Sequence, residues 1–365
     1  MEELDGVVVG AGAVGLACAA RLAAPGRTVA VLEAHARHGV ETSSRNSEVV
    51  HAGLYYPPGS LKSRLCREGR RALYRLGAQG RFFIRKTGKL VVAVEAAEAA
   101  GLEALCAKAI AAGAEGVGLI DGAEARRRAP GLRAEAALWS PETGIVDSEE
   151  LMGWYRAQAE ERGAVFLFST SLEAAEPKAG GYELRLSTGE AARARWVVNA
   201  AGLRCDAVAA LPGLDVDAAG YRLHWCKGDY FRMKRPPALA HLVYPMPARH
   251  GLGVHMTLDR AGGVRLGPDT AFVDSLDYAV DPAKAEAFAA SVSRYWPGVR
   301  AEDLVPDQSG IRPKLSGPSE GPRDFVVQEE SARGLPGWVN LVGIESPGLT
   351  ASPAIAEMTA GLLGL

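Results

Sequence analysis

The sequence contains little cysteine and no long apolar segment. Its five cysteines are odd in number and widely spaced, and no two form a Cys-x-x-Cys pair, which argues against a disulfide framework and a thiolate zinc site. No apolar run approaches the ~20 residues that a membrane-spanning helix needs. The first strand is expected at Val7–Val9, which leaves no room for a signal peptide ahead of it. We therefore expect a reduced, cytosolic protein without a bound metal; peripheral membrane contact, which needs only a surface patch, stays open.

A large charge of one sign is also absent. The 365 residues include 41 Lys and Arg against 43 Asp and Glu, a formal net charge of −2, so the chain lacks the overall basic character typical of nucleic-acid-binding proteins. The basic run Arg126–Arg128 fits a solvated helix face. With 48% hydrophobic and 23% charged residues, the composition is that of an ordinary globular protein, long enough for two domains.

The N-terminal segment has the pattern strand, glycine turn, helix, strand. Val7–Val9 is a short β-branched run typical of a buried strand, and Gly10–Gly15 interrupts it. An Ala/Leu-rich helix is expected over Leu16–Leu22, ended by Pro25-Gly26, before a second buried strand at Thr28–Leu32. One β-α-β unit with parallel strands places the protein in the α/β class.

The middle of the chain has a different character. Short strands separated by Gly and Pro are expected between 223 and 273, with a hairpin signal at Ala261–Gly263, so this region should form an antiparallel sheet. Because parallel character occurs at both ends and in the middle, we expect two interleaved domains. Further helices are expected at Leu61–Leu76, Ala96–Ala112, Gly122–Ala129, Glu149–Glu161 and about Ala354–Leu363.

A glycine-rich turn marks a dinucleotide site. Gly10, Gly12 and Gly15 follow a strand and open a helix; they allow a tight turn, close approach to a pyrophosphate and close helix–strand packing, while the helix N–H groups favour phosphate. Glu33 ends the next strand about 20 residues later, where a carboxylate accepts hydrogen bonds from ribose hydroxyls. NAD and FAD share this ribose, so the turn alone leaves both cofactors open.

Two further turns favour FAD. The stretches 197–202 and 340–350 resemble the second and third signatures of FAD-binding two-dinucleotide-fold proteins, where the chain meets the adenine half and the flavin end. The chain thus resembles the D-amino-acid-oxidase-like superfamily of FAD oxidoreductases, and within it the L-2-hydroxyglutarate dehydrogenase/oxidase family. One departure is Glu48, where a small residue is expected in many members. The closer resemblance is carried by residues 42–56, 58–62, 227–231, 241–245, 253–257, 310–315 and 343–351.

The resemblance implies FAD, non-covalently bound because no attachment signal is present at Cys66 or elsewhere. The cofactor would lie across an α/β domain formed by 1–80, 145–215 and 310–365, with the flavin facing the antiparallel sheet of a substrate domain formed by 81–144 and 216–309. Thr42 and Ser43 would lie near the pyrophosphate, and Leu172 would contact adenine through its backbone. The residues expected to bind FAD are Gly10, Gly12, Ala13, Val14, Gly15, Glu33, Ala34, Thr42, Ser43, Ser44, Asn46, Ser47, Leu172, Ala201, Gly202, Gly343, Gly348, Leu349 and Thr350.

Oxidation of a 2-hydroxy acid moves a hydride from C2 to flavin N5 while a base takes the hydroxyl proton, so the protein must supply a base, a carboxylate anchor and orientation. Histidine has a suitable pKa: His51 is favoured, His255 is second, and His224 is a third histidine in a candidate segment. The resemblance implies that Arg312 binds the substrate carboxylate, for which its planar donors are suited. Candidates for the second carboxylate of a dicarboxylic acid are Tyr56, Lys227, Tyr230, Tyr244 and Lys314.

Three functions remain in view. The favoured one is oxidation of a small 2-hydroxy acid, with L-2-hydroxyglutarate, giving 2-oxoglutarate, as the leading substrate. An amine or amino-acid oxidase of the glycine or sarcosine type would also suit the fold and Arg312, although oxidation of a neutral amine needs no strong base such as His51. A flavin-binding relay subunit is the third, and the presence of both residues argues against it. The electron acceptor (oxygen, a quinone or a protein) and the oligomeric state stay open.

Overall fold

The first of the two main sheets contains the parallel strands around the N-terminus. The computed structural model describes residues 2–247 and 253–365. Strand order is β10-β11-β12-β1-β2-β9, with β20 beside β12 and β19 beside β20. The pairings β9–β2, β2–β1, β1–β12 and β12–β20 are parallel. The strands are β1 (Glu2–Val9), β2 (Val29–Leu32), β9 (Val165–Leu167), β10 (Leu172–Lys178), β11 (Gly181–Leu186), β12 (Ala191–Asn199), β19 (Val326–Glu330) and β20 (Leu335–Val342).

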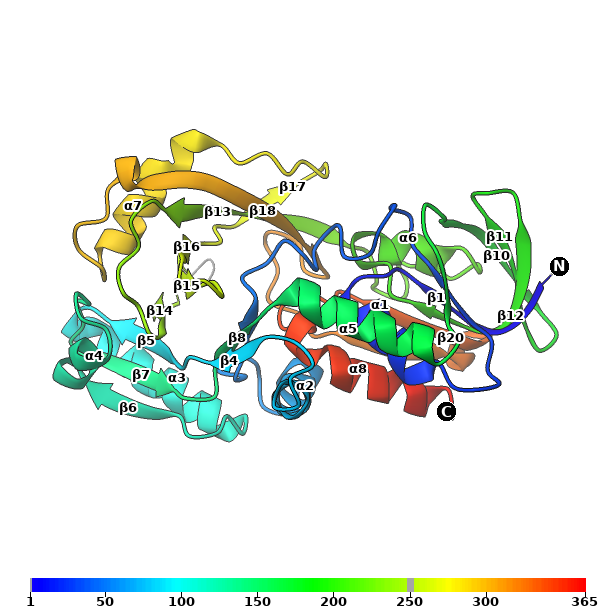
Figure 1. Ribbon diagram of the computed structural model, residues 1–365, viewed down its shortest axis with the longest axis horizontal. Coiled ribbons are helices and arrows are strands. Elements are labelled where there is room, and N and C mark those ends of the chain that lie inside the picture. Colours follow the sequence, from blue (N-terminus) through cyan, green and yellow to red (C-terminus); the bar gives the residue numbers. More distant parts are fainter. Residues whose placement is uncertain (1, 248–252) are drawn as a thin grey trace.

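Both faces of this sheet are buried, which explains the unbroken apolar runs of its central strands. Side chains alternate between the faces: Val8 and Val198 belong to the core beneath α1 and α8, whereas Val7 and Val197 belong to a second core that includes Val208 of α6. Helix α1 packs against both α5 and α8, and Figure 1 shows these three helices side by side. The helices of this half are α1 (Ala13–Leu22), α2 (Leu61–Gly77), α5 (Ser148–Glu161), α6 (Cys205–Ala210) and α8 (Gly348–Leu362).

The second main sheet has the strand order β17-β13-β16-β15-β14-β5-β7-β6, with β18 paired to β13. The prediction of an antiparallel sheet is confirmed except at one pairing: β14 lies parallel to β5, with Val243 opposite Leu90. These strands come from distant parts of the chain, so no tight hairpin forces them to be antiparallel. The strands are β5 (Lys89–Ala93), β6 (Gly118–Asp121), β7 (Ala136–Ser140), β13 (His224–Met233), β14 (Leu242–Pro245), β15 (Met256–Leu258), β16 (Val264–Leu266), β17 (Ala271–Val273) and β18 (Leu304–Lys314).

Small elements complete this half and join it to the first. Figure 1 shows the two main sheets toward opposite ends of the molecule, with the long pair β13 and β18 reaching toward the middle. A three-stranded sheet is formed by β3 (Val49–Val50), β8 (Gly144–Val146) and β4 (Ile84–Lys86). The helices are α3 (Ala99–Ala111), α4 (Gly122–Arg128) and α7 (Ala285–Ser293), with 3-10 turns η1 (Ala96–Glu98), η2 (Gly202–Arg204), η3 (Pro282–Lys284), η4 (Ala301–Asp303) and η5 (Ser331–Arg333).

Helix α8 begins earlier than the sequence suggested, at Gly348 instead of about Ala354. Pro353 lies inside the helix and cannot donate a backbone hydrogen bond. The hydroxyl of Ser352 instead donates to the Leu349 carbonyl at 2.9 Å, which satisfies the acceptor that the proline leaves free. The prediction was therefore wrong by about a turn and a half, because a neighbouring side chain compensates for the proline.

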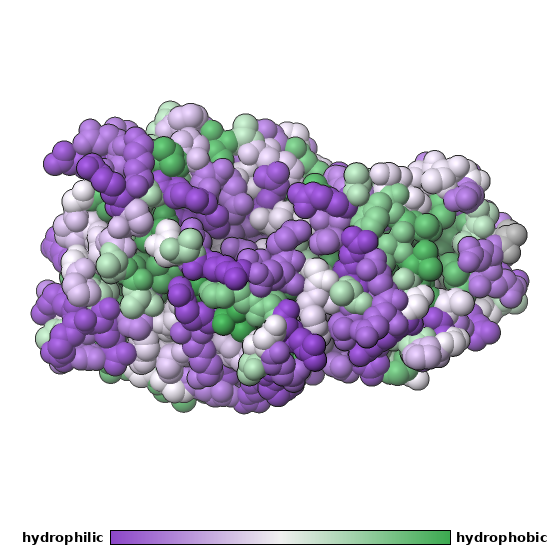
Figure 2. Space-filling view, viewed as in Figure 1, coloured by the Kyte–Doolittle hydropathy of each residue, from purple (hydrophilic) through white to green (hydrophobic). Residues whose placement is uncertain are grey.

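Three further features concern the molecular surface, the length and apolar character of the helices, and the predicted domain limits. Figure 2 shows hydrophilic residues over most of one face, with apolar residues in smaller patches between them. Within residues 2–247 and 253–365, no helix combines the length and apolar character needed to cross a membrane. The predicted domain limit at residue 310 falls inside β18, which continues to Lys314; the two-domain division itself stays a prediction.

Two helical glycines allow a test of the α2–α8 packing. A Cβ on Gly69 of α2 would lie 2.2 Å from the Thr350 carbonyl oxygen, whereas one on Gly153 of α5 would meet nothing within 4 Å. Gly69→Ala should lower the free energy of unfolding by about 1–3 kcal/mol through overpacking. Gly153→Ala should raise it by about 0.5–1 kcal/mol, because alanine favours the helix. Denaturant unfolding measures both; equal effects of the two substitutions would contradict this packing.

Candidate active site

A cleft of about 1220 Å³ lies between the two halves of the molecule. It exceeds the ~300–1,000 Å³ of an ordinary small-molecule pocket, so it has room for a ligand larger than a simple metabolite. All three glycine-bearing turns open on it: Gly10 and Gly12 after β1, Ala201 and Gly202 after β12, and Gly348 and Leu349 at the start of α8. The strands β13 and β18 contribute the opposite wall through Gly228, Tyr230 and Arg312.

The first glycine turn can form only because its glycines have no Cβ. Gly10 has φ +102°, and a Cβ there would lie 2.5 Å from the Ala200 carbonyl oxygen. A Cβ on Gly15 would lie 1.9 Å from the Gly10 oxygen, so Gly15 serves packing and does not line the cleft in the described chain. Gly12 is the N-cap of α1 and has no side chain to cap the helix. The helix start therefore faces the cleft as an anion site.

Glu33 is held firmly at the end of β2. One carboxylate oxygen accepts a hydrogen bond from the Ala11 N–H at 2.8 Å, and the other accepts from the His35 N–H at 2.9 Å. A carboxylate has about four acceptor positions, so two remain for the hydroxyls of a ribose. Glu33 lines the cleft, as do Thr170 and Leu172 nearby. This end fits the adenosine half of a dinucleotide.

The loop after β2 covers the middle of the cleft. The Ser43 hydroxyl accepts from the Ala13 N–H at 2.9 Å, and the Ser47 and Tyr230 hydroxyls lie 3.0 Å apart. Asn46 donates to the Ser43 carbonyl at 2.7 Å, which shapes the loop. Ser44 is turned away, because its hydroxyl donates to the Val40 and Glu41 carbonyls at 3.3 Å.

Glu48 shows what a larger residue does at its position. It has φ +54°, which is unusual for a side chain other than glycine. Its carboxylate accepts from the Ser148 N–H at 2.9 Å and from the Ser148 hydroxyl at 2.7 Å. The negative charge lies at the start of α5, where the helix dipole favours it. Glu48 therefore anchors the loop to α5 and leaves the cleft unaltered.

His51 lies on the cleft wall directly after β3. Its backbone N–H donates to the Thr350 hydroxyl at 3.0 Å, and its Nε2 lies 3.2 Å from the Ser346 hydroxyl. Burial, and after it the charge of Lys89, lowers the pKa of His51 to about 3. The imidazole is therefore neutral near pH 7 and has an unprotonated nitrogen available to accept a proton.

A buried lysine lies beside His51. Lys89, the first residue of β5, is 1% exposed, and its Nζ lies 4.8 Å from the ring centroid of Tyr55 and 4.4 Å from that of Tyr244. Such contacts are each worth about 0.5–2 kcal/mol, less than the several kcal/mol that removing an ammonium from water costs. Burial accordingly lowers the pKa of Lys89 to about 7. The ring of Tyr244 also stacks on the ring of His255, and the two ring centroids lie 3.5 Å apart.

Sequence reasoning missed Lys89, and Tyr55 was included in the family resemblance without an assigned role. A signal for Lys89 was present: it opens the run Lys-Leu-Val-Val-Ala, in which every residue is buried. A lysine is almost never fully buried unless it is paired, so a lysine inside an apolar strand is a candidate for a functional charge. By its pattern alone, the run is typical of an ordinary buried strand.

Arg312 projects from β18 into the cleft. One guanidinium nitrogen donates to the Asp269 carbonyl at 2.8 Å. A Cβ on Gly228 of the neighbouring strand would lie 2.4 Å from that nitrogen, so glycine at 228 leaves the space that the arginine occupies. The remaining donors of the guanidinium suit a carboxylate.

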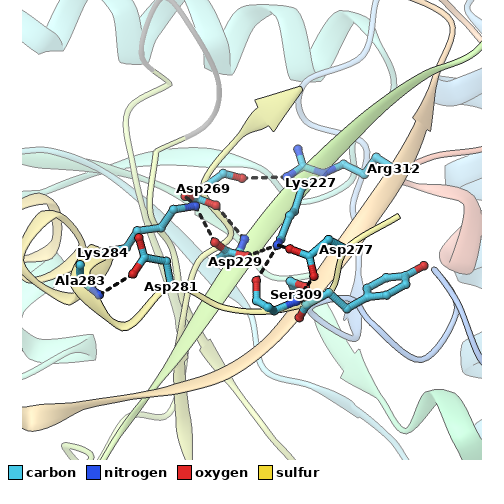
Figure 3. A network of polar contacts seen from close by, with 11 residues as sticks. Lys227, Asp229, Asp269, Asp277, Asp281, Ala283, Lys284, Ser309 and Arg312 are labelled. Carbon is cyan, nitrogen blue, oxygen red and sulfur yellow. Dashed lines mark hydrogen bonds and ion pairs between the residues drawn. The ribbon is translucent and has the colours of Figure 1, made fainter. Parts of the chain in front are cut away.

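An ion-pair network behind Arg312 fixes its partner (Figure 3). Lys284 pairs with both Asp229 and Asp269, and the Asp229 N–H donates to Asp269 at 2.7 Å. Lys227 belongs to the same network: its Nζ lies 3.3 Å from an Asp277 carboxylate oxygen and donates to the Ala279 carbonyl. Lys227 does not line the cleft in the described chain. It supports the wall that carries Arg312 instead of facing the cleft.

Lys314 lines the cleft but is already paired. Its Nζ lies 2.9 Å from Glu345, which also contacts the Nζ of Lys62 at 3.0 Å. Burial raises the pKa of Glu345, but Lys62 and Lys314 outweigh it, so that the pKa is lowered overall. The trio carries a net charge of +1 beside the turn that precedes α8. At that place the positive charge suits an anionic part of a bound cofactor. It is less suited to binding the substrate, because Lys314 already contacts a carboxylate.

The structure brings most of the predicted site residues to one cleft. Tyr56, Tyr230, Tyr244, His255 and Arg312 line it together with His51. Gly343 instead serves packing, since a Cβ there would lie 2.6 Å from the Leu315 side chain, and the Thr350 hydroxyl holds the backbone at His51. Among the described residues, the predicted ones that do not line the cleft are Gly15, Ser44, Lys227, Gly343 and Thr350, and His224 is also outside it.

These features fit FAD. A carboxylate suited to a ribose, a helix start with glycine at its N-cap and a cationic turn all border a single cleft, as the adenosine, pyrophosphate and flavin parts of FAD would require. His51, His255 and Arg312 lie on the same cleft, so the groups suited to proton transfer and carboxylate binding border the space left for the redox ring.

Flavin retention tests the ribose contact. Glu33→Gln keeps the shape of the side chain but removes the charge that strengthens its hydrogen bonds. We expect FAD to bind about tenfold more weakly, as measured by reconstitution of stripped protein followed by flavin fluorescence. Glu3→Gln is the matched control, because Glu3 is exposed at the far end of the same β-α-β unit. Unchanged affinity in Glu33→Gln would contradict the assignment.

Comparison with known proteins agrees with this geometry. Residues 5–362 match the family model described as FAD dependent oxidoreductase. The chain is 39% identical to a protein of Arabidopsis thaliana named L-2-hydroxyglutarate dehydrogenase, mitochondrial, over 98% of this chain and 82% of the relative.

Two solved structures are also similar. The FAD-bound L-alpha-glycerophosphate oxidase of Mycoplasma pneumoniae has a TM-score of 0.89 and 23% identity, covering 100% of this chain and 96% of that one. The glycine oxidase of Geobacillus kaustophilus has a TM-score of 0.82 and 21% identity, covering 100% and 95%. At these identities the likeness supports the fold. The sequence comparisons decide the family: the chain belongs to the FAD-dependent oxidoreductases, and among them to the family of the L-2-hydroxyglutarate dehydrogenases.

Proposed function

We propose that this protein is an FAD-dependent dehydrogenase or oxidase that converts a small 2-hydroxy acid to the 2-oxo acid, with L-2-hydroxyglutarate as its substrate. The observation that carries the proposal is the presence of a neutral histidine, His51, and an arginine with free donors, Arg312, on the cleft that fits FAD. The name of the Arabidopsis relative supports the same substrate.

Each residue has a task in this reaction. Arg312 binds the carboxylate next to C2 and so fixes the orientation of the C2–H bond. His51 takes the hydroxyl proton as the carbonyl forms, and the charge it gains is offset by the anionic substrate. When bound, FAD supplies the redox chemistry by accepting the two electrons and the hydrogen that leave C2. The Ser346 hydroxyl, 3.2 Å from His51 Nε2, orients the imidazole.

We further propose that the FAD is held without a covalent bond. The thiol of Cys66 is buried and lies 3.3 Å from the His51 carbonyl oxygen. Burial raises the pKa of Cys66 to about 12, so the thiol is protonated and a poor nucleophile. The two-domain division and the cytosolic location, with or without peripheral membrane contact, stay predictions, and the electron acceptor stays open between oxygen, a quinone and a protein.

Anaerobic reduction of the purified flavoprotein tests the reaction. L-2-hydroxyglutarate should bleach the flavin absorbance, because its C2–H bond is oriented over the ring by Arg312. The D-enantiomer, which presents a different group in that position, should bleach it more slowly by about two orders of magnitude or more. Bleaching by glycine or sarcosine, with none by the hydroxy acid, would favour an amine oxidase and contradict the proposal.

A second test concerns the base. His51→Gln should lower the rate of flavin reduction by about 10²–10⁴-fold, the usual contribution of a general base, while FAD still binds. His38→Gln is the matched control, because burial also lowers the pKa of His38, which pairs with Glu149 away from the cleft. Stopped-flow absorbance gives both rates. An equal loss in the two variants would show that a buried histidine matters only for the fold.

A further inference from the structure

Lys89 differs from the other lysines near the cleft that are not exposed in having no carboxylate partner among the described residues. Lys227 contacts Asp277, Lys284 contacts Asp229 and Asp269, and Lys62 and Lys314 share Glu345, each within 4.0 Å. Lys89 makes no ion pair or hydrogen bond with any described residue; its contacts there are with two aromatic rings. Residues 248–252, which lie outside the described ranges, include no Asp or Glu in the sequence.

The two tyrosines whose rings contact Lys89 have hydroxyl groups without a hydrogen-bond acceptor among the described residues. The Tyr55 hydroxyl is buried and has no hydrogen-bond partner among the described residues. The Tyr244 hydroxyl makes no hydrogen bond to them either. Both tyrosines line the cleft. Lys89 is not among the described residues that line the cleft, and its amine lies against the rings of the two tyrosines that do. None of these three groups has an acceptor among the described residues.

Such an arrangement calls for an anion. Buried polar groups are nearly always hydrogen-bonded, and a buried charge is nearly always paired. Aromatic faces compensate an ammonium only in part, and no carboxylate among the described residues lies beside Lys89 to offset the burial that lowers its pKa. A carboxylate would accept from the ammonium and from a tyrosine hydroxyl together, because it has two oxygens and about four acceptor positions.

We propose that Lys89, assisted by the hydroxyl of Tyr55, binds the distal carboxylate of the substrate and makes the enzyme selective for dicarboxylic 2-hydroxy acids. This inference rests on the proposed function and adds to it, because Arg312 is then the site of the carboxylate next to C2 and Lys89 the site of the other. It replaces Lys227 and Lys314 as candidates for that contact, since each already has a carboxylate partner.

Specificity arises from this division of charges. A monocarboxylic acid of the same length would satisfy Arg312 but leave the Tyr55 hydroxyl, which borders the cleft, and the amine of Lys89 beside it without an acceptor. Sites built to hydrogen-bond a charged group reject ligands that lack it, because the buried partners then remain unsatisfied. The selectivity should therefore appear in binding as well as in turnover.

The test compares two unreactive ligands of equal carbon number, glutarate and pentanoate. Each is titrated into the FAD-loaded protein and followed by the perturbation of flavin absorbance. The native protein should bind glutarate about 100-fold more tightly than pentanoate. Lys89→Met, which replaces the ammonium by an apolar group of similar length, should reduce this ratio to near one, mainly by weakening glutarate. The flavin spectrum and melting temperature establish that the variant is folded and loaded.

Lys108→Met is the matched comparison. Lys108 lines the cleft, is exposed and donates to the Tyr55 backbone carbonyl at 2.9 Å. The variant should keep the glutarate preference. The proposal is overturned if the native protein does not distinguish the two ligands, if Lys89→Met retains the preference, or if Lys108→Met loses it.

Turnover separates this inference from the proposed function. With L-2-hydroxyglutarate and L-2-hydroxypentanoate as reductants, Lys89→Met should lose rate with the first and keep that with the second. If neither compound bleaches the native flavin, the proposed reaction fails. The glutarate preference and its loss in Lys89→Met would still decide whether Lys89 binds a distal carboxylate.

Discussion

The site depends on the close approach of backbone to backbone where three separate turns meet. Gly10 lies so near Ala200, and Gly15 so near Gly10, that an added Cβ would be 2.5 Å and 1.9 Å from a carbonyl oxygen. These contacts bring the first and second turns together at the carboxyl ends of parallel strands, where α/β sheets bind ligands. Helix α8, packed against α1 and α2, adds the third turn. The cleft is therefore a property of the backbone, and its chemistry is supplied by the side chains around it.

Electrostatics divides the side chains into two groups. Most cations around the cleft are neutralised by carboxylates, so they stiffen its walls; the network of Lys227, Lys284 and Asp269 holds the carbonyl that Arg312 contacts. Lys89 is buried without such a partner among the described residues, and it lies near His51, whose pKa is lowered by burial and by the charge of Lys89. A site with a buried lysine that lacks a carboxylate partner and a neutral histidine suits an anionic substrate whose hydroxyl group gives up a proton.

The sequence predicted the fold well because its strongest signals are local. The unbroken apolar run Val7–Val9, the glycine turn and the acid at Glu33 fix a parallel β-α-β unit without reference to the rest of the chain. It failed in two places. The parallel pairing of β14 with β5 joins distant parts of the chain, and the early start of α8 depends on a local hydrogen bond of Ser352 that compensates for Pro353. Lys227 could not be distinguished from Lys89 as a substrate contact, because only the folded chain reveals which lysine has a carboxylate beside it.

The most direct measurement of the central claim is a crystal structure of the FAD-loaded protein with glutarate. We expect FAD to lie along the three turns. One carboxylate of glutarate should bind the Arg312 guanidinium, and the other should lie within hydrogen-bonding distance of Lys89 Nζ. Glutarate bound with neither carboxylate at these two residues, or FAD placed away from the Gly10 turn, would contradict it.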